Sequence, residues 1–304
     1  MDNNSLPWRP LTVFLSVAFG GSILLSLMIG LTGGYRSPLA GLRLLTMFVP
    51  AVAVLVAWLT TGAGVDIEWN RFPLRWLPVA LLILPLCIHA LALPGVVVME
   101  GRLPWANWLT ADPDGLYHTP PELGWGTVTL SSLLGRIAIN AMIGLFIVSF
   151  LAVFEEIGWR AFMLPRLVAS FGIRRGAVAS ALIFALWHVP YQLLGIQHVE
   201  NVPPVPLALI SPLGEFGAGL FLAYIWLKTG SLPLVSLAHG SLNNWGQYAF
   251  KFMNTSGERD LVLFALVNLA LLFVGLSALT MAPTKSLRSA ESRVNTSRSW
   301  TSKS

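Results

Sequence analysis

The chain is poor in charged residues and in cysteine. Only 11% of its 304 residues are Asp, Glu, Lys or Arg, and the mean hydropathy is +0.70. Soluble domains carry about 25% charged residues, so this composition excludes an ordinary soluble globular protein. The single cysteine, Cys87, excludes an internal disulfide and any zinc site built from cysteines.

Several common catalytic signatures are also missing. None of the five histidines is followed by Glu, so the chain has no His-Glu-x-x-His zinc motif. It contains neither a Gly-x-Ser-x-Gly nor a Gly-x-Gly-Asp sequence. The net charge of +5 comes from basic residues spread over connectors, with no stripe of Arg and aromatic residues, so we expect no nucleic-acid partner.

Long apolar runs take up most of the sequence. A membrane-spanning helix needs about 20 apolar residues, and eight runs approach or exceed that length. These runs are 11–31, 39–61, 77–99, 131–154, 176–194, 207–227, 232–250 and 261–281. They predict an all-α polytopic membrane protein of about eight transmembrane helices. We expect one integral membrane domain over residues 1–283, embedded in the lipid bilayer.

The distribution of Lys and Arg predicts how the chain crosses the membrane. If the N-terminus lies inside, most basic residues fall in the inner segments, and the long outer segment 100–129 is mainly acidic. Positive residues favour the cytoplasmic side, so both termini are predicted to be cytoplasmic, in a cell membrane of bacterial type. Residues 284–304 are predicted to form a basic, disordered cytoplasmic tail.

Two adjacent carboxylates, Glu155 and Glu156, follow the fourth apolar run. Charged residues at membrane depth are costly, so they indicate function by default. If the helix continues, Glu156 and Arg160 are four residues apart and share a face, which predicts a salt bridge. Glu155 points about 100° away and is left free for chemistry.

Two later runs carry histidines at helical spacing. Phe184 and His188 lie one turn apart, as do His239 and Asn243. Each pair alone is also explained by packing or by hydrogen bonds between helices. Glu215 lies in the sixth run, and two interpretations of it stay open. It either forms a hydrogen bond to a neighbouring helix or lines a polar chamber.

Taken together, these residues predict a polar catalytic chamber between the helices. Glu155, His188 and His239 are suitable ligands for a divalent metal such as zinc, with an open position for water. Alternatively, Glu155 activates water directly, oriented by His188, while His239 and Asn243 donate to the developing oxyanion. Both schemes hydrolyse a peptide bond without a protein nucleophile, and the residues alone leave the choice open.

At these residues the chain resembles the CPBP intramembrane proteases, also called the Abi or CAAX protease family. The family pattern is Glu-Glu-x-x-x-Arg, then Phe-x-x-x-His, then His-x-x-x-Asn on successive helices. The chain matches all three in order, and the similar core covers about residues 130–250. The family includes the eukaryotic prenyl-protein endoprotease and bacterial proteins linked to bacteriocin processing and self-immunity.

The resemblance implies roles for the matched residues. Glu155 is expected to activate water with His188 as its partner, and Asn243 with His239 to stabilise the oxyanion. Arg160 is expected to hold Glu156 in place. The chain is thereby predicted to be an intramembrane endopeptidase acting on a peptide or protein substrate in or near the membrane. The alternative is a non-proteolytic membrane scaffold or bacteriocin self-immunity protein that binds a peptide in the same chamber.

Overall fold

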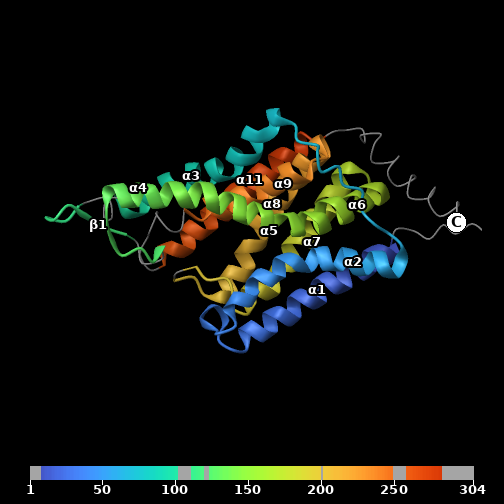
Figure 1. Cartoon of the computed structure of the whole chain (residues 1–304), viewed down its shortest axis with the longest axis horizontal. Coiled ribbons are helices and arrows are strands. Elements are labelled where there is room, and N and C mark those ends of the chain that lie inside the picture. The colour runs from blue at the N-terminus through green and yellow to red at the C-terminus, as the bar shows by residue number, and fades with distance from the viewer. Residues whose placement is uncertain (1–7, 102–110, 120–122, 200, 249–257, 283–304) are drawn as a thin grey trace, which may run out of the picture.

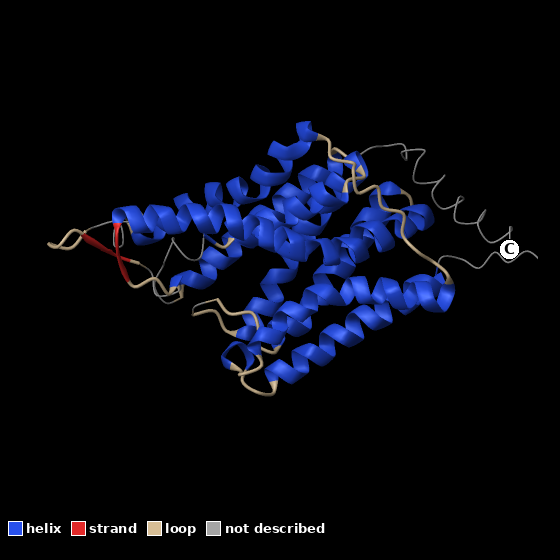
Figure 2. Cartoon of the chain, in the orientation of Figure 1, coloured by secondary structure: helices blue, strands red, loops and turns tan. Residues whose placement is uncertain are grey.

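The computed structural model describes residues 8–101, 111–119, 123–199, 201–248 and 258–282. Within them the secondary structure is helical except for one short antiparallel pair of strands, β1 (Leu116–His118) with β2 (Thr127–Thr129), and loops connect the elements (Figure 2). The prediction of an all-α fold is confirmed. The tail predicted over 284–304 lies outside the described residues.

Seven helical segments are long and apolar enough to cross a membrane. They are α1 (Trp8–Gly30), η2 with α2 (Ala40–Phe48, Val49–Thr61), η3 with α3 (Leu74–Trp76, Leu77–Glu100), the segment Leu130–Phe171, α7 (Ile173–Leu193), α8 (Pro204–Thr229) and α11 (Arg259–Thr280). The eighth expected helix is present as α9 (Leu232–Ser241) followed by the π-helix η8 (Leu242–Gly246). Its described part is too short to count as a span, and the end of the predicted run at 250 lies outside the described residues.

The segment Leu130–Phe171 is one continuous helix of 42 residues that crosses the molecule (Figure 1). It consists of α4 (Leu130–Ile139), η6 (Asn140–Gly144), α5 (Leu145–Glu156), η7 (Ile157–Met163) and α6 (Leu164–Phe171), with η6 and η7 in π conformation. The sequence predicted a span ending at residue 154, with the glutamate pair at its edge. That boundary was wrong, because the polar residues that interrupt the apolar run are paired inside the bundle and do not end the helix.

Close helix approaches hold the bundle together. In the C-terminal half, α8 packs between α7 and α11, and Gly217 of α8 lies against Gly275 of α11 with no space for a Cβ atom. Likewise α9 packs on α5 where Gly240 contacts Ser149. Small residues at such points let helix backbones approach closely within a bilayer. The second contact brings the helix that carries His239 against the helix that carries the glutamates.

An N-terminal hairpin of α1 and α2 is attached to η7 by aromatic side chains. Phe14 of α1 contacts both Trp159 and Phe162, with ring centroids 5.3 and 5.1 Å apart. Trp187 of α7 contacts Trp159 and donates its indole N–H to the carbonyl oxygen of Ala18. The residues directly after the glutamate pair therefore connect the first two helices to the rest of the bundle.

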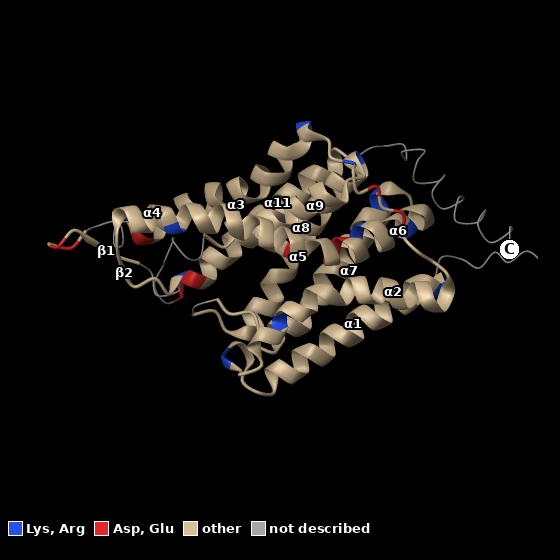
Figure 3. Cartoon of the chain, viewed as in Figure 1, with Lys and Arg blue, Asp and Glu red and all other residues tan. Residues whose placement is uncertain are grey.

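Apolar and charged residues occupy different parts of the surface. Large apolar side chains are exposed along the helices, among them Leu24, Leu55, Phe146, Phe150, Leu209 and Phe273. Charged residues gather mainly near the helix ends (Figure 3). At one end Arg166 donates to the carbonyl oxygen of Gly64, 3.0 Å away, and Trp8 packs on Phe171. An apolar belt between charged ends is what an integral membrane protein requires.

Candidate active site

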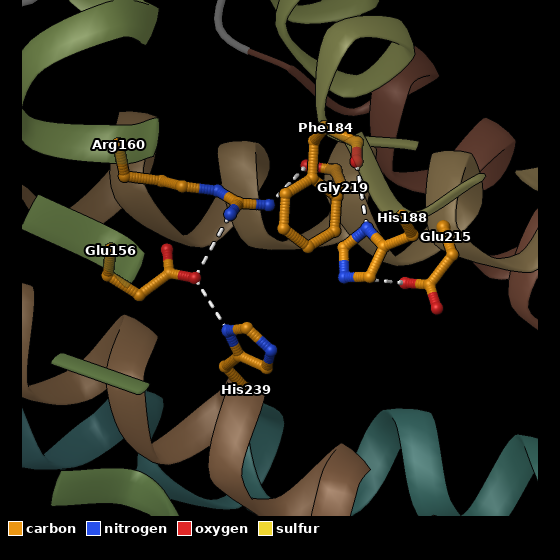
Figure 4. Close-up of polar contacts among 7 residues, drawn as sticks. All are labelled: Glu156, Arg160, Phe184, His188, Glu215, Gly219 and His239. Atoms are coloured by element: carbon orange, nitrogen blue, oxygen red, sulfur yellow. Dashed lines mark hydrogen bonds and ion pairs between the residues drawn. The ribbon is translucent and has the colours of Figure 1, made fainter. Parts of the chain in front are cut away.

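Glu156 lies at the centre of a buried polar network. Its Oε1 atom accepts from Arg160 Nη1 at 3.0 Å and from His239 Nδ1 at 2.7 Å (Figure 4). The Arg160 side chain is 1% exposed, Glu156 is fully buried and His239 is 5% exposed. The predicted Glu156–Arg160 pair is thus present, and His239 is its third member.

Two further contacts position the guanidinium of Arg160. Its Nη2 donates to the carbonyl oxygen of Gly219 in α8 at 3.4 Å, and its Cζ lies 4.5 Å from the ring centroid of Phe184 in α7. Arg160 therefore joins the long helix to α7, α8 and, through Glu156, to α9. Removing one member of such a network leaves an uncompensated buried charge, which typically costs about 3–5 kcal/mol.

A cavity of about 190 Å³ lies beside this network. It is lined by Ser22, Arg43, Leu44, Thr46, Met47, Glu155, Trp187, His188, Tyr191 and Asn243. Three of the four predicted catalytic residues, Glu155, His188 and Asn243, thus meet at one cavity although they come from three helices. Glu155 is 4% exposed, and its Oε2 atom has no hydrogen-bond partner among the described residues.

The imidazole of His188 is oriented from two sides. Its Nδ1 donates to the carbonyl oxygen of Phe184 at 2.9 Å. This leaves Nε2 of the neutral imidazole to accept a hydrogen bond or to take up a proton. That Nε2 lies 4.0 Å from Glu215 Oε2 (Figure 4). Sequence reasoning left the role of Glu215 open, although a carboxylate inside an apolar span was an available signal for the site.

The third motif is divided between the network and the cavity. His239 and Asn243 were expected to address one point, but His239 contacts Glu156 and is not among the residues that line the cavity. Asn243 lines the cavity, whereas its buried neighbour Asn244 donates to the carbonyl oxygen of Asn140 at 3.2 Å. The π conformation of η8 changes the angle between successive residues, so the α-helical spacing rule does not hold here. The catalytic role of His239 stays a prediction.

Seven of the ten residues that line the cavity do not belong to the motifs. Ser22 belongs to α1, Arg43 and Thr46 belong to η2, and Tyr191 follows His188 in α7. The sequence contained one usable signal for them, a cation in the first turn of the second span. Nothing in the spacing connected that cation to the glutamate pair.

The arrangement does not form a three-ligand metal site. The described residues contain no group of three or more His, Cys, Asp or Glu side chains placed to hold a metal ion. Of the predicted ligands Glu155, His188 and His239, the last donates its Nδ1 proton to Glu156 and is not among the residues that line the cavity. Metal dependence therefore stays a prediction.

Comparison with known proteins agrees with this geometry. Residues 136–245 match the family model described as type II CAAX prenyl endopeptidase Rce1-like. The match includes all of the residues of the three motifs and none of the cavity residues from α1 and η2. No curated protein matches the chain.

Proposed function

We propose that the chain is an intramembrane endopeptidase of the CPBP/CAAX type that hydrolyses a peptide bond with water activated by Glu155 and His188. The match of residues 136–245 to the CAAX prenyl endopeptidase model supports this proposal. The observation that carries this proposal is the cavity that Glu155, His188 and Asn243 share. A carboxylate, an imidazole and an amide donor suffice for general acid–base hydrolysis without a protein nucleophile.

In the proposed mechanism, Glu155 accepts a proton from a water molecule while the water oxygen attacks the carbonyl carbon. The Asn243 amide donates to the oxyanion that develops on the carbonyl oxygen. The carbon–nitrogen bond then breaks, and the proton is returned to the leaving amine. His188 orients the water through Nε2, because its Nδ1 is engaged with Phe184.

The network of Glu156, Arg160 and His239 stabilises the backbone next to this site. Arg160 is held by Glu156, and together they fix the π segment that follows Glu155. Because Glu156 already neutralises Arg160, Glu155 keeps its oxygens for the cavity. In this proposal Glu156 stabilises the site and Glu155 takes part in the reaction.

The substrate in this proposal is a peptide or protein segment in or beside the bilayer. The end of the bundle that holds Arg166, Arg71 and the start of α1 is rich in cations, so we assign it to the cytoplasm. Both chain termini would then be cytoplasmic, and a bacterial cell membrane is the proposed location.

Cleavage by the purified full chain in nanodiscs tests the function. An internally quenched peptide library provides the substrates, and Glu155→Gln and His188→Ala are compared with the wild type. We expect each substitution to lower the rate by about 10²–10⁴-fold, as for loss of a general base or its partner. Glu68→Gln is the matched control, because Glu68 pairs with Arg71 at an exposed site away from the cavity.

Full activity in both cavity variants would contradict the mechanism. Loss of cleavage with retention of peptide binding would confirm the assignment of Glu155 to chemistry. A cellular phenotype that persists in Glu155→Gln would favour a scaffold or immunity function instead. Activity that resists chelators and needs no added metal would support the direct scheme over the metal-dependent one.

A further inference from the structure

The cavity beside Glu155 has a positive side as well as a negative one. Its lining residues include one carboxylic acid, Glu155, and one guanidinium, Arg43. Arg43 belongs to η2, which lies outside the segment that matches the family model. The cation is therefore a contribution of the N-terminal helices to the same cavity.

The guanidinium of Arg43 is available to a ligand. It is exposed and forms no ion pair with any described residue. Tyr191 lines the same cavity as Arg43 and Glu155. An unpaired cation in a membrane span is costly and indicates a functional partner by default.

The remaining wall suits an apolar peptide. Leu44 and Met47, next to Arg43, and Trp187, next to His188, line the cavity. A carboxylate that entered this space without a cation would be repelled by Glu155. Arg43 offsets that repulsion and offers a planar donor pair that matches a carboxylate.

We propose that Arg43 binds a carboxylate of the substrate and thereby sets which peptide bond lies against Glu155. This inference rests on the proposed function, since it assigns a specificity to the same cavity. The carboxylate belongs either to the C-terminus of the peptide or to an Asp or Glu side chain near the scissile bond. Both sources share the chemistry that Arg43 recognises.

Three short probes separate these sources. One is acetyl-Leu-Leu-Leu with a free C-terminal carboxylate, the second is the same peptide amidated, and the third is amidated with Glu in place of one Leu. Binding is measured in nanodiscs to the full chain carrying Glu155→Gln, with and without Arg43→Gln, and empty nanodiscs correct for partitioning. Arg36→Gln is the matched control, because Arg36 lies over the Tyr35 ring and does not line the cavity.

We expect at least one carboxylate probe to bind about tenfold or more tightly than the neutral probe, as for a charge-assisted hydrogen bond. Arg43→Gln is expected to abolish that preference and Arg36→Gln to keep it. Preference for the first probe identifies a C-terminal carboxylate, and preference for the third identifies an acidic side chain. Equal binding of all three probes, or a preference that survives Arg43→Gln, would overturn the proposal and leave Arg43 to contact lipid headgroups.

The same measurement separates this inference from the proposed function. Binding to the Glu155→Gln chain needs no hydrolysis, so carboxylate preference is measured even if the wild type cleaves nothing. A wild type that cleaves peptides but shows no dependence on Arg43 would leave the protease function in place and contradict only the specificity.

Discussion

Glu155 and Glu156 are neighbours in the chain, but their side chains lie in different surroundings. Glu156 accepts from Arg160 and His239 in a fully buried network, whereas Glu155 faces a cavity with His188 and Asn243. Asn243 and Asn244 repeat this division, since Asn244 ties η8 to η6 and Asn243 lines the cavity. In both pairs the first residue lines the cavity and the second forms hydrogen bonds with residues of the bundle.

The largest effect is expected when the buried network of Glu156, Arg160 and His239 is disrupted, and it is a loss of folding stability. We expect Arg160→Met to lower the free energy of unfolding by about 3–5 kcal/mol, because Glu156 is left charged and buried. Thermal unfolding of the purified protein in detergent measures the change. The double variant Glu156→Met with Arg160→Met should recover part of the loss, and Glu155→Gln should unfold close to the wild type. A Glu155→Gln protein as unstable as Arg160→Met would contradict the different roles of Glu155 and Glu156.

The asparagine pair offers a second test. Asn243→Ala should lower kcat by about 10²–10³-fold, the usual cost of removing one oxyanion donor, while the melting temperature is unchanged. Asn244→Ala should instead lower the stability by about 0.5–1.5 kcal/mol, because the part-buried hydrogen bonds from its amide to the carbonyl oxygens of Asn140 and Ala141 are lost. Peptide cleavage and thermal unfolding are measured on the same preparations. The comparison fails if the two substitutions exchange these effects.

Gly240 tests whether the network depends on close helix contact. A Cβ atom at this position would clash with Ser149 in α5, so Gly240→Ala should separate α9 from α5. We expect a loss of about 1–3 kcal/mol, as for other overpacked sites, together with lower activity because His239 moves away from Glu156. Gly135→Ala is the control, since nothing lies within 4 Å of a Cβ atom there. Equal stability of the two variants would show that α9 is not held at this contact.

Glu215 should give the smallest effect. Its carboxylate is partly exposed and lies 4.0 Å from His188 Nε2, a distance at which an ion pair contributes about 1 kcal/mol or less. Glu215→Gln is therefore expected to lower the cleavage rate less than about tenfold without changing the melting temperature. A loss as large as that of Glu155→Gln would move Glu215 into the catalytic group.

The sequence predicted the bundle and three of the residues that line the cavity, Glu155, His188 and Asn243, because these follow from local patterns. Apolar runs gave the spanning helices, and the spacing of Glu156 and Arg160 gave their contact. The predicted boundary at residue 154 failed because charge was taken to end a span, whereas paired charges are tolerated inside one. The sequence placed His239 and Asn243 one turn apart, and in the structure His239 donates to Glu156 whereas Asn243 lines the cavity.

The approach of distant segments was the part that the sequence could not supply. Arg43 and Ser22 join the cavity through the packing of α1 and η2, and no periodicity links them to residues more than a hundred positions later. His239 meets Glu156 because a glycine lets two helices approach, which is a property of the packed pair. Contacts of this kind depend on tertiary structure.

The 42-residue helix from Leu130 to Phe171 has a further consequence for Glu155. At 1.5 Å per residue it is about 63 Å long, roughly twice the thickness of the hydrocarbon layer. A rod of this length tilts or extends beyond the bilayer, and its inclination follows the local thickness of the lipid. Because Glu155 is part of that rod, its depth changes with the inclination. Lipid chain length is thus a physical variable that sets where in the membrane the carboxylate is presented.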